Sequence, residues 1–263
     1  MARVELPFRV SINTQVDGPD GAPWVVLSNS LGADLRMWES QIEMLTRKYR
    51  VLRYDQRGHG QSDTPPGPYS FDLLVADVIA MMDHFSIEKA DLIGLSMGAM
   101  TGMGLGIKHP ERFGRMVLAD ARSVATDAYK EMWDQRIAAV NVGGLEAVAE
   151  GSLRLWFTEG WREANPNATA AARAMIVATK PQGYIASCCA LRELDYLKDL
   201  GKLNIPVLYL CGGEDKGAPP EEMRAMAKVT PGSKYVEIPS AGHIANINQP
   251  NEFNAAVKEF LDI

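Results

Sequence analysis

The chain has 263 residues, 46% of them hydrophobic, and a formal net charge of −6 at pH 7. A chain of this length can bury one sizeable core, so we expect a single α/β domain with an insertion. The charge is modest and is spread along the sequence without a basic run, which argues against nucleic acid as a partner.

Cysteine usage and the apolar stretches predict a cytoplasmic protein with no membrane attachment. The odd number of cysteines, Cys188, Cys189 and Cys211, indicates a reducing compartment, since adjacent cysteines seldom bridge. The first residues, Met1–Pro7, lack the apolar segment of a signal peptide. The longest uncharged stretch, Leu92–Ile107, is too short to span a bilayer and contains five glycines.

Predicted strands and helices alternate in the first part of the chain. Alternating apolar and polar residues from Phe8 to Thr14, followed by turn residues from Val16 to Gly21, predict an antiparallel edge hairpin. Continuous apolar runs predict buried strands, and apolar residues at helical spacing predict helices between them. The strands are Trp24–Leu27, Val51–Tyr54, Ala90–Leu95 and Phe113–Ala119, and the helices are 37–45, 71–85 and a glycine-rich one that Pro110 ends. This alternation predicts a mostly parallel central sheet flanked by helices.

The second part of the chain begins with a helical segment. Four helices and no strand are predicted there, at Tyr129–Val140, Leu145–Phe157, Ala168–Thr179 and Pro181–Leu191. The alternation then resumes with Val207–Cys211, a helix at Pro220–Val229, the strand Lys234–Ile238 and a helix at Pro250–Leu261. We therefore divide the chain into core residues 1–122, a helical lid at 123–200 over the carboxyl ends of the strands, and core residues 201–263.

The central predicted strand ends in the run Gly94-Leu95-Ser96-Met97-Gly98, which has the G-x-S-x-G pattern of a nucleophile elbow. In such an elbow the backbone turns sharply at the serine, so that its hydroxyl stands exposed at the carboxyl end of the strand. Gly94 and Gly98 fit this geometry because a Cβ at either position would collide with the neighbouring backbone. The motif also occurs by chance, so its meaning depends on what the rest of the chain supplies.

A serine hydroxyl is a weak nucleophile at neutral pH and needs an imidazole that a carboxylate orients. Of the four histidines, His84 near a helix end and His109 before Pro110 are interpreted as structural or exposed. His59, in an Arg-Gly-His-Gly loop, is interpreted as bracing that loop. His243 follows the last predicted strand, in a loop that faces the elbow, and we predict that it is the base.

Asp215 is the predicted acid because it directly follows the penultimate strand and completes the chain order Ser, Asp, His. Two alternatives stay open. Glu214 is adjacent but should point the other way, and Asp120 ends the preceding strand, from which an acid could also reach the imidazole. If Asp120 is not the acid, we expect it to cap a helix or brace the lid.

A tetrahedral oxyanion needs two preorganised backbone N–H donors. One is predicted at Met97, directly after the nucleophile and at the start of its helix. The other is predicted at Leu31, in the loop Asn29–Gly32 that follows the strand Trp24–Leu27. Ser30, in the same loop, is interpreted either as a turn hydroxyl or as a contact to the substrate.

Taken together, these motifs resemble those of the α/β-hydrolase superfamily over the whole chain and, within it, the 3-oxoadipate enol-lactonase family. The residues behind the narrower resemblance are Leu27–Gly32, where most relatives carry His-Gly, together with Tyr54–Gly60, Gly94–Gly98, Pro181–Tyr184, Cys188–Ala190 and Ala241–Asn246. The chain departs from this pattern at Ala99, where the family usually has glycine, and at Asp120–Ser123, which is not typical and leaves the substrate open.

The resemblance implies an α/β-hydrolase fold and hydrolysis of the enol-lactone of 3-oxoadipate in aromatic-compound breakdown, without a metal or organic cofactor. The implied partner is a small-molecule lactone or ester; the oligomeric state is not predicted. The alternatives are a carboxylesterase with the same catalytic relay, meaning the series Ser96, His243 and Asp215, and a non-catalytic binding protein of the same fold. A dehalogenase is disfavoured because that chemistry places an aspartate at the elbow.

The implied substrate carries a carboxylate, so a cation near the site is expected. The candidate cations, each of which also fits an ordinary solvated surface charge, are Arg36, Arg122, Arg136, Arg154 and Arg192. Trp133, early in the lid, is the predicted aromatic neighbour of the substrate, with a plain core role as the alternative.

Overall fold

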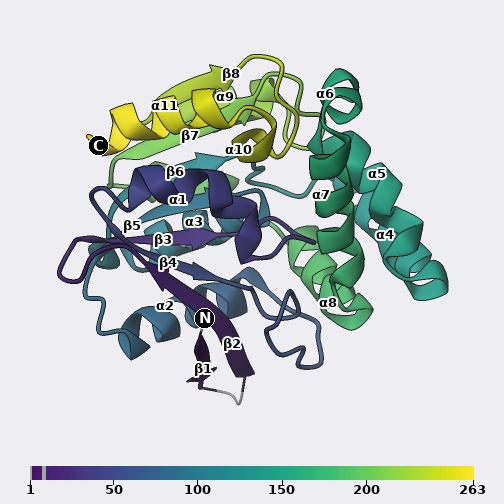
Figure 1. Cartoon of the computed structure of the whole chain (residues 1–263), viewed down its shortest axis with the longest axis horizontal. Coiled ribbons are helices and arrows are strands. Elements are labelled where there is room, and N and C mark those ends of the chain that lie inside the picture. Colours follow the sequence, from purple (N-terminus) through teal and green to yellow (C-terminus); the bar gives the residue numbers. More distant parts are fainter. Residues whose placement is uncertain (1, 8–9) are drawn as a thin grey trace.

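The centre of the molecule is β5 (Ala90–Leu95), a strand whose side chains are all buried. The computed structural model describes residues 2–7 and 10–263, and β5 lies in the middle of an eight-stranded sheet ordered β1-β2-β4-β3-β5-β6-β7-β8 (Figure 1). The other strands are β1 (Ala2–Leu6), β2 (Val10–Asp17), β3 (Trp24–Ser28), β4 (Arg50–Tyr54), β6 (Phe113–Ala119), β7 (Val207–Gly212) and β8 (Lys234–Ile238). From β4 to β8 the neighbours are parallel, as predicted.

Helices cover both faces of the sheet. On one face α1 (Glu39–Leu45), α10 (Ala245–Asn248) and α11 (Pro250–Leu261) contact one another, and on the other α2 (Phe71–His84) packs against α3 (Met97–Lys108). On this second face a short 3₁₀ helix, Leu197–Lys202, packs against both α3 and α9 (Pro220–Val229). Within the described residues, no helix has the length and apolar character needed to cross a bilayer.

The glycines of α3 let this helix approach the sheet more closely than other residues would. A Cβ at Gly102 would lie 2.6 Å from Leu92 Cδ2 and 2.8 Å from Leu118 Cδ2, both of which belong to the sheet. Each glycine costs an exposed helix about 1 kcal/mol, so α3 depends on its packing for stability. That close packing fixes the start of α3 against the end of β5.

A helical insertion lies between β6 and β7. Its helices are α4 (Asp127–Gly143), α5 (Glu146–Trp156), α6 (Glu159–Ala164), α7 (Pro166–Ala178) and α8 (Pro181–Arg192). In Figure 1 these teal and green helices gather on the right, beyond the strand ends. α4 packs against α5 and α8, and α5 packs against α7. The short helix α6 was not predicted, and a single bridge between Val124 and Asp195 joins the two ends of the insertion.

The N-terminal edge of the sheet differs from the prediction in its pairing. The strand predicted at Phe8–Thr14 is β2, which begins at Val10; Phe8 and Arg9 lie outside the described residues. Its hairpin partner is β1, which was not predicted, and its other antiparallel neighbour is β4. Of the predicted turn Val16–Gly21, the first two residues belong to β2, and the rest does not close a hairpin because β4 lies between β2 and β3.

Candidate active site

Ser96 occupies the sharp turn between β5 and α3. Its backbone has φ 56° and ψ −118°, in a region that a residue other than glycine adopts only under strain. A Cβ on Gly98 would collide with the Ser28 carbonyl oxygen, so the glycine requirement inferred from the sequence is confirmed at this position. Ser96 is 7% exposed and lines a cavity. The fold thus presents a serine hydroxyl at the end of the central strand.

His243 lies against Ser96, although the two are far apart in the sequence. The distance from His243 Nε2 to Ser96 Oγ is 2.8 Å. The insertion holds the histidine loop in place, since the His243 amide donates to the Leu155 carbonyl at 3.2 Å and the Ile244 amide donates to the Trp156 carbonyl at 3.1 Å. Because Leu155 and Trp156 belong to α5, this helix and the sheet together keep the buried imidazole next to the serine.

Asp215 orients the other side of this imidazole. Its Oδ2 lies 2.8 Å from His243 Nδ1, and its Oδ1 accepts hydrogen bonds from the amides of Gly217 at 2.6 Å and Ala218 at 3.1 Å. A carboxylate in this position favours the proton on Nδ1 and leaves Nε2 free to accept from the serine hydroxyl. Glu214 is exposed, so of the two adjacent acids only Asp215 reaches the histidine.

Asp120 is fully buried next to Asp215 but does not contact His243 in the described residues. Its Oδ1 accepts from the Gly212 amide at 2.7 Å, so it braces the end of β7, and its carboxyl group also meets the amide of Ala245, the first residue of α10. The expectation that it caps a helix agrees with this contact, whereas no described hydrogen bond joins it to the insertion. Burial and the neighbouring Asp215 carboxylate raise the pKa of Asp120.

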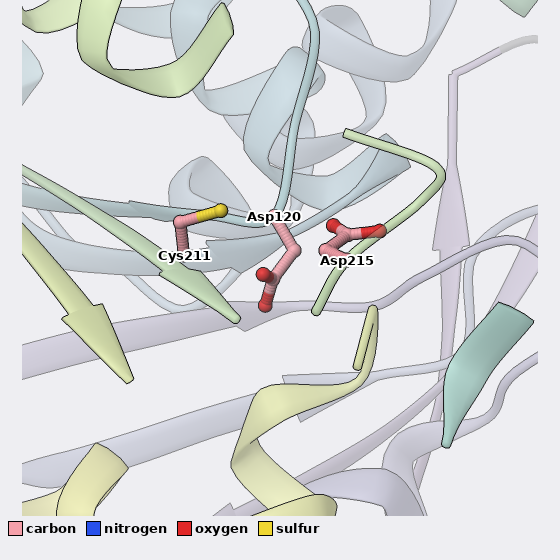
Figure 2. A group of neighbouring side chains, drawn as sticks. All are labelled: Asp120, Cys211 and Asp215. Atoms are coloured by element: carbon pink, nitrogen blue, oxygen red, sulfur yellow. The ribbon is translucent and has the colours of Figure 1, made fainter. Parts of the chain in front are cut away.

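Figure 2 shows Asp120, Asp215 and Cys211 side by side, with ligand atoms within 4.8 Å of one another. This spacing is that of a metal site. However, both oxygens of Asp215 already accept hydrogen bonds, and burial raises the pKa of the Cys211 thiol. We therefore interpret Asp120 and Asp215 as a pair of acids beside the neutral thiol of Cys211.

Of the two predicted oxyanion donors, Met97 directly follows Ser96 and Leu31 lines the same cavity as Ser96. Met97 is the first residue of α3, and the first amides of a helix have no acceptor within the helix. The Leu31 amide makes no hydrogen bond within the part of the chain that the structure describes. Leu31 and Ser30 both line the same cavity as Ser96.

A buried network that was not predicted holds the Leu31 loop. Asn29 Oδ1 accepts from Trp38 Nε1 at 2.8 Å, and Asn29 Nδ2 donates to the Tyr54 carbonyl at 2.7 Å. Gln56 Nε2 in turn donates to the Asn29 carbonyl at 2.7 Å. Asn29 thus fixes the loop through both ends of its amide. The signal in the sequence was the position of Asn29 in the loop Leu27–Gly32, one of the segments behind the family resemblance.

The cavity that contains Ser96 and His243 has a volume of about 540 Å³. Helices of the insertion supply most of its walls, which are largely apolar and aromatic: Leu31, Met100, Tyr129, Leu155, Trp156 and Tyr184. Trp133 also lines it, and its Nε1 is buried without a hydrogen-bond partner in the described residues. A ligand in this cavity would be largely removed from water.

Two of the five candidate arginines, Arg122 and Arg136, line the cavity; their interpretation as solvated surface charges is wrong. Arg122 is already engaged, since it donates to the Gly217 carbonyl and pairs with Glu222, both at 2.6 Å. Arg136 donates to Tyr184 Oη at 2.6 Å and to Ser152 Oγ, and within the described ion pairs it has no carboxylate. Exposed Lys216 also lines the cavity and was not among the predicted cations.

The other three arginines lie elsewhere. Arg36 pairs with Asp34 and Arg192 with Asp134, and neither lines the cavity. Arg154 is exposed and faces a separate cavity. For these three the interpretation as surface charges agrees with the structure.

His59 lies in the core, as its interpretation as a loop brace requires. Its Nδ1 is 3.2 Å from the Arg57 carbonyl, and burial lowers the pKa of His59 to about 4. The imidazole is therefore neutral at neutral pH and donates from Nδ1. It does not contact Ser96 in the described residues.

Replacing His59 with Asn is expected to reduce the loss of stability in acid. Because the pKa of His59 is lower in the folded protein, the unfolded chain binds the proton more tightly. The contribution of His59 to the free energy of unfolding is therefore complete above its unfolded pKa and is lost as the pH falls toward its folded pKa. Between about pH 7 and pH 4 the wild type should lose about 3 kcal/mol of unfolding free energy that the variant retains. Urea unfolding of both proteins over this range measures the difference, and parallel curves would contradict the assignment.

Comparisons with known proteins agree with this architecture. A family model described as alpha/beta hydrolase fold matches residues 23–250. The chain is 36% identical over 252 residues to 3-oxoadipate enol-lactonase 2 of Acinetobacter baylyi, covering 96% of this chain and 93% of that protein. The crystal structure of the enol-lactonase from Burkholderia xenovorans superposes with a TM-score of 0.96 at 36% identity over 100% of both chains. A thermophilic, malate-bound esterase from Thermogutta terrifontis superposes with a TM-score of 0.94 at 29% identity, over 100% of this chain and 98% of that one.

Proposed function

This chain belongs to the α/β-hydrolase family, and from that premise we propose that it hydrolyses the enol-lactone of 3-oxoadipate to 3-oxoadipate. The family and the fold predicted from the sequence are confirmed, and the enzyme is a hydrolase. The observation that carries the narrower proposal is the series of hydrogen bonds from Ser96 through His243 to Asp215, in a cavity that also contains Arg136.

In the proposed reaction, Ser96 Oγ attacks the lactone carbonyl while His243 Nε2 takes its proton. The amides of Leu31 and Met97 donate to the oxyanion of the tetrahedral intermediate. Collapse of this intermediate breaks the ring C–O bond and expels an enolate. The proton that His243 took from Ser96 passes to this enolate, which becomes a ketone, and His243 is neutral again. Water, deprotonated by His243, then attacks the acyl-enzyme and releases the acid and free Ser96.

Arg136 is the proposed partner of the substrate carboxylate. The guanidinium lies over the Trp133 and Tyr184 rings, at 5.8 and 5.9 Å from their centroids, in the wall of the cavity. Arg122 is a weaker candidate because Glu222 already neutralises it. A carboxylate held at Arg136 would place the rest of a small lactone toward Ser96.

The relatives support a lactone or ester substrate, and they also define the nearest alternative. The enol-lactonases of Acinetobacter and Burkholderia favour the lactone, whereas the Thermogutta esterase favours a carboxylesterase with the same relay. A binding protein of the same fold is disfavoured, because a complete serine, histidine and aspartate series would then have no use. Localisation in the cytoplasm and the place in aromatic-compound breakdown belong to the proposal.

Turnover of two substrates tests this proposal. The enzyme is expected to prefer the enol-lactone of 3-oxoadipate over p-nitrophenyl acetate by about 10²-fold or more in kcat/KM, since only the lactone presents a carboxylate to Arg136. A preference for the aryl ester would identify a carboxylesterase. Absence of turnover with both substrates would favour the binding protein.

Replacing Arg136 with Gln is expected to weaken lactone use selectively. Because charge-assisted hydrogen bonds to a carboxylate contribute about 1.5–3 kcal/mol, KM for the lactone should rise about 10- to 100-fold, with little change for p-nitrophenyl acetate. Arg192→Gln is the matched control, since Arg192 pairs with Asp134 outside the cavity. Equal losses on both substrates would indicate that Arg136 only supports the cavity wall.

A further inference from the structure

The acid of the proposed relay has a second carboxyl group beside it. Asp120 follows β6 and Asp215 follows β7, so two neighbouring parallel strands deliver both side chains to one place (Figure 2). Both residues are buried, and their carboxyl groups lie within 4.8 Å of each other. Asp120 Oδ2 has no hydrogen-bond partner in the described residues. The relay as proposed does not use this group.

The hydrogen bonds decide which of the two carries the negative charge. Asp215 accepts from His243 Nδ1 and from the Gly217 and Ala218 amides, whereas Asp120 meets only the two amides of Gly212 and Ala245 among the described residues. Two buried carboxyl groups this close cannot both ionise without a large cost, and the charge settles where most donors meet it. Asp215 is therefore the carboxylate, and Asp120 is the neutral acid.

The surroundings of Asp120 support this division. The titratable groups that face it are Asp215 and Cys211, from β7 and the loop after it. The Cys211 thiol stays neutral because burial raises its pKa. From α10 the Ala245 amide favours the charged form, as Gly212 does, but burial and Asp215 outweigh both amides. Removing the charge of Asp215 would thus remove one of the two causes that keep Asp120 protonated.

We propose that Asp120 is a reserve acid, which ionises when the carboxylate of Asp215 is lost and then stabilises the imidazolium form of His243 in its place. The proton of Asp120 goes to solvent, and its new charge lies next to the space that the Asp215 side chain vacates. This inference rests on the proposed relay. In the intact enzyme Asp120 positions the end of β7 through Gly212 and the start of α10 through Ala245.

Four proteins test the proposal with p-nitrophenyl acetate: wild type, Asp120→Asn, Asp215→Ala and the double variant. Asp120→Asn keeps an oxygen for the Gly212 amide and should stay within about 3-fold of wild type. Asp215→Ala should lose about 10²-fold in kcat, and the double variant about 10⁴-fold, which is the usual cost of removing the acid from such a relay. The pH profile of Asp215→Ala should show an ionisation that the double variant lacks.

Equal residual rates in Asp215→Ala and the double variant would overturn the reserve acid and leave the relay intact. Wild-type rates in both would instead refute Asp215 as the acid, and with it the proposed relay. Cys211→Ala combined with Asp215→Ala is the matched control, since it alters the same cluster without removing a carboxyl group, and it should behave as Asp215→Ala. Should Asp215→Ala not fold, the same comparison in an Asp215→Ser background decides between these outcomes.

Discussion

Ser96→Ala is expected to lower kcat for the enol-lactone by about 10⁶-fold, because removing the nucleophile of such a relay abolishes the acyl-enzyme route altogether. The change removes one oxygen and keeps the backbone of the elbow. The midpoint of thermal unfolding should therefore stay close to that of wild type, and the cavity should still bind 3-oxoadipate. Steady-state kinetics and calorimetric titration with this product measure the two effects separately.

Ser30→Ala is the matched control for this prediction. Ser30 lines the same cavity as Ser96, but its hydroxyl has no place in the proposed chemistry beyond a contact to the substrate. Its removal should change kcat only a few-fold. A Ser96→Ala enzyme that retains a tenth of the wild-type rate would mean that another group performs the attack.

His243→Ala is expected to cost about as much as Ser96→Ala, again about 10⁶-fold in kcat, since the two side chains act as one unit. For the same reason the double variant should be no slower than either single variant. The 2.8 Å contact between Nε2 and Oγ is the structural basis of this non-additivity. Kinetics of the three variants on p-nitrophenyl acetate measures it directly.

His109→Ala is the control for the histidine, because His109 lies at the far end of α3 and is partly exposed. It should retain wild-type activity. Losses that multiply in the Ser96 and His243 double variant would contradict a shared relay, since independent groups contribute additively in free energy.

The sequence was sufficient to predict the parts of the site that strand ends determine. The G-x-S-x-G run places Ser96, and alternating strands and helices bring Asp215 and His243 to the same edge of a parallel sheet. Their chain order then predicted which side chains would meet. The structure brings these three together as predicted, with contacts of 2.8 Å.

Which arginine faces the cavity without an acidic partner could not be predicted in this way. Arg122 and Arg136 differ in their partners, and these partners are distant in the sequence: Glu222 for Arg122, and Ser152 and Tyr184 for Arg136. Helical spacing indicates which face of a helix is apolar, but it does not show which residue of another helix meets a given arginine. Tertiary packing within the insertion decides this point.

The prediction of strand pairing at the N-terminal edge of the sheet failed for a similar reason. A turn-rich run between two strands favours a hairpin locally, but β4 takes the position beside β2 and excludes β3. The short strand β1 carries little signal of its own, since only Val4 and Leu6 are buried in it. Neither error touches the site, because the functional loops leave the parallel strands of the sheet.

The most direct measurement is mass spectrometry of the wild-type enzyme after reaction with a fluorophosphonate, which traps an activated serine. We expect one adduct per chain, located on Ser96, together with loss of lactone hydrolysis in proportion to labelling. Protein labelled at Ser96 that still opens the lactone at the wild-type rate, or an adduct at another residue, would contradict this expectation.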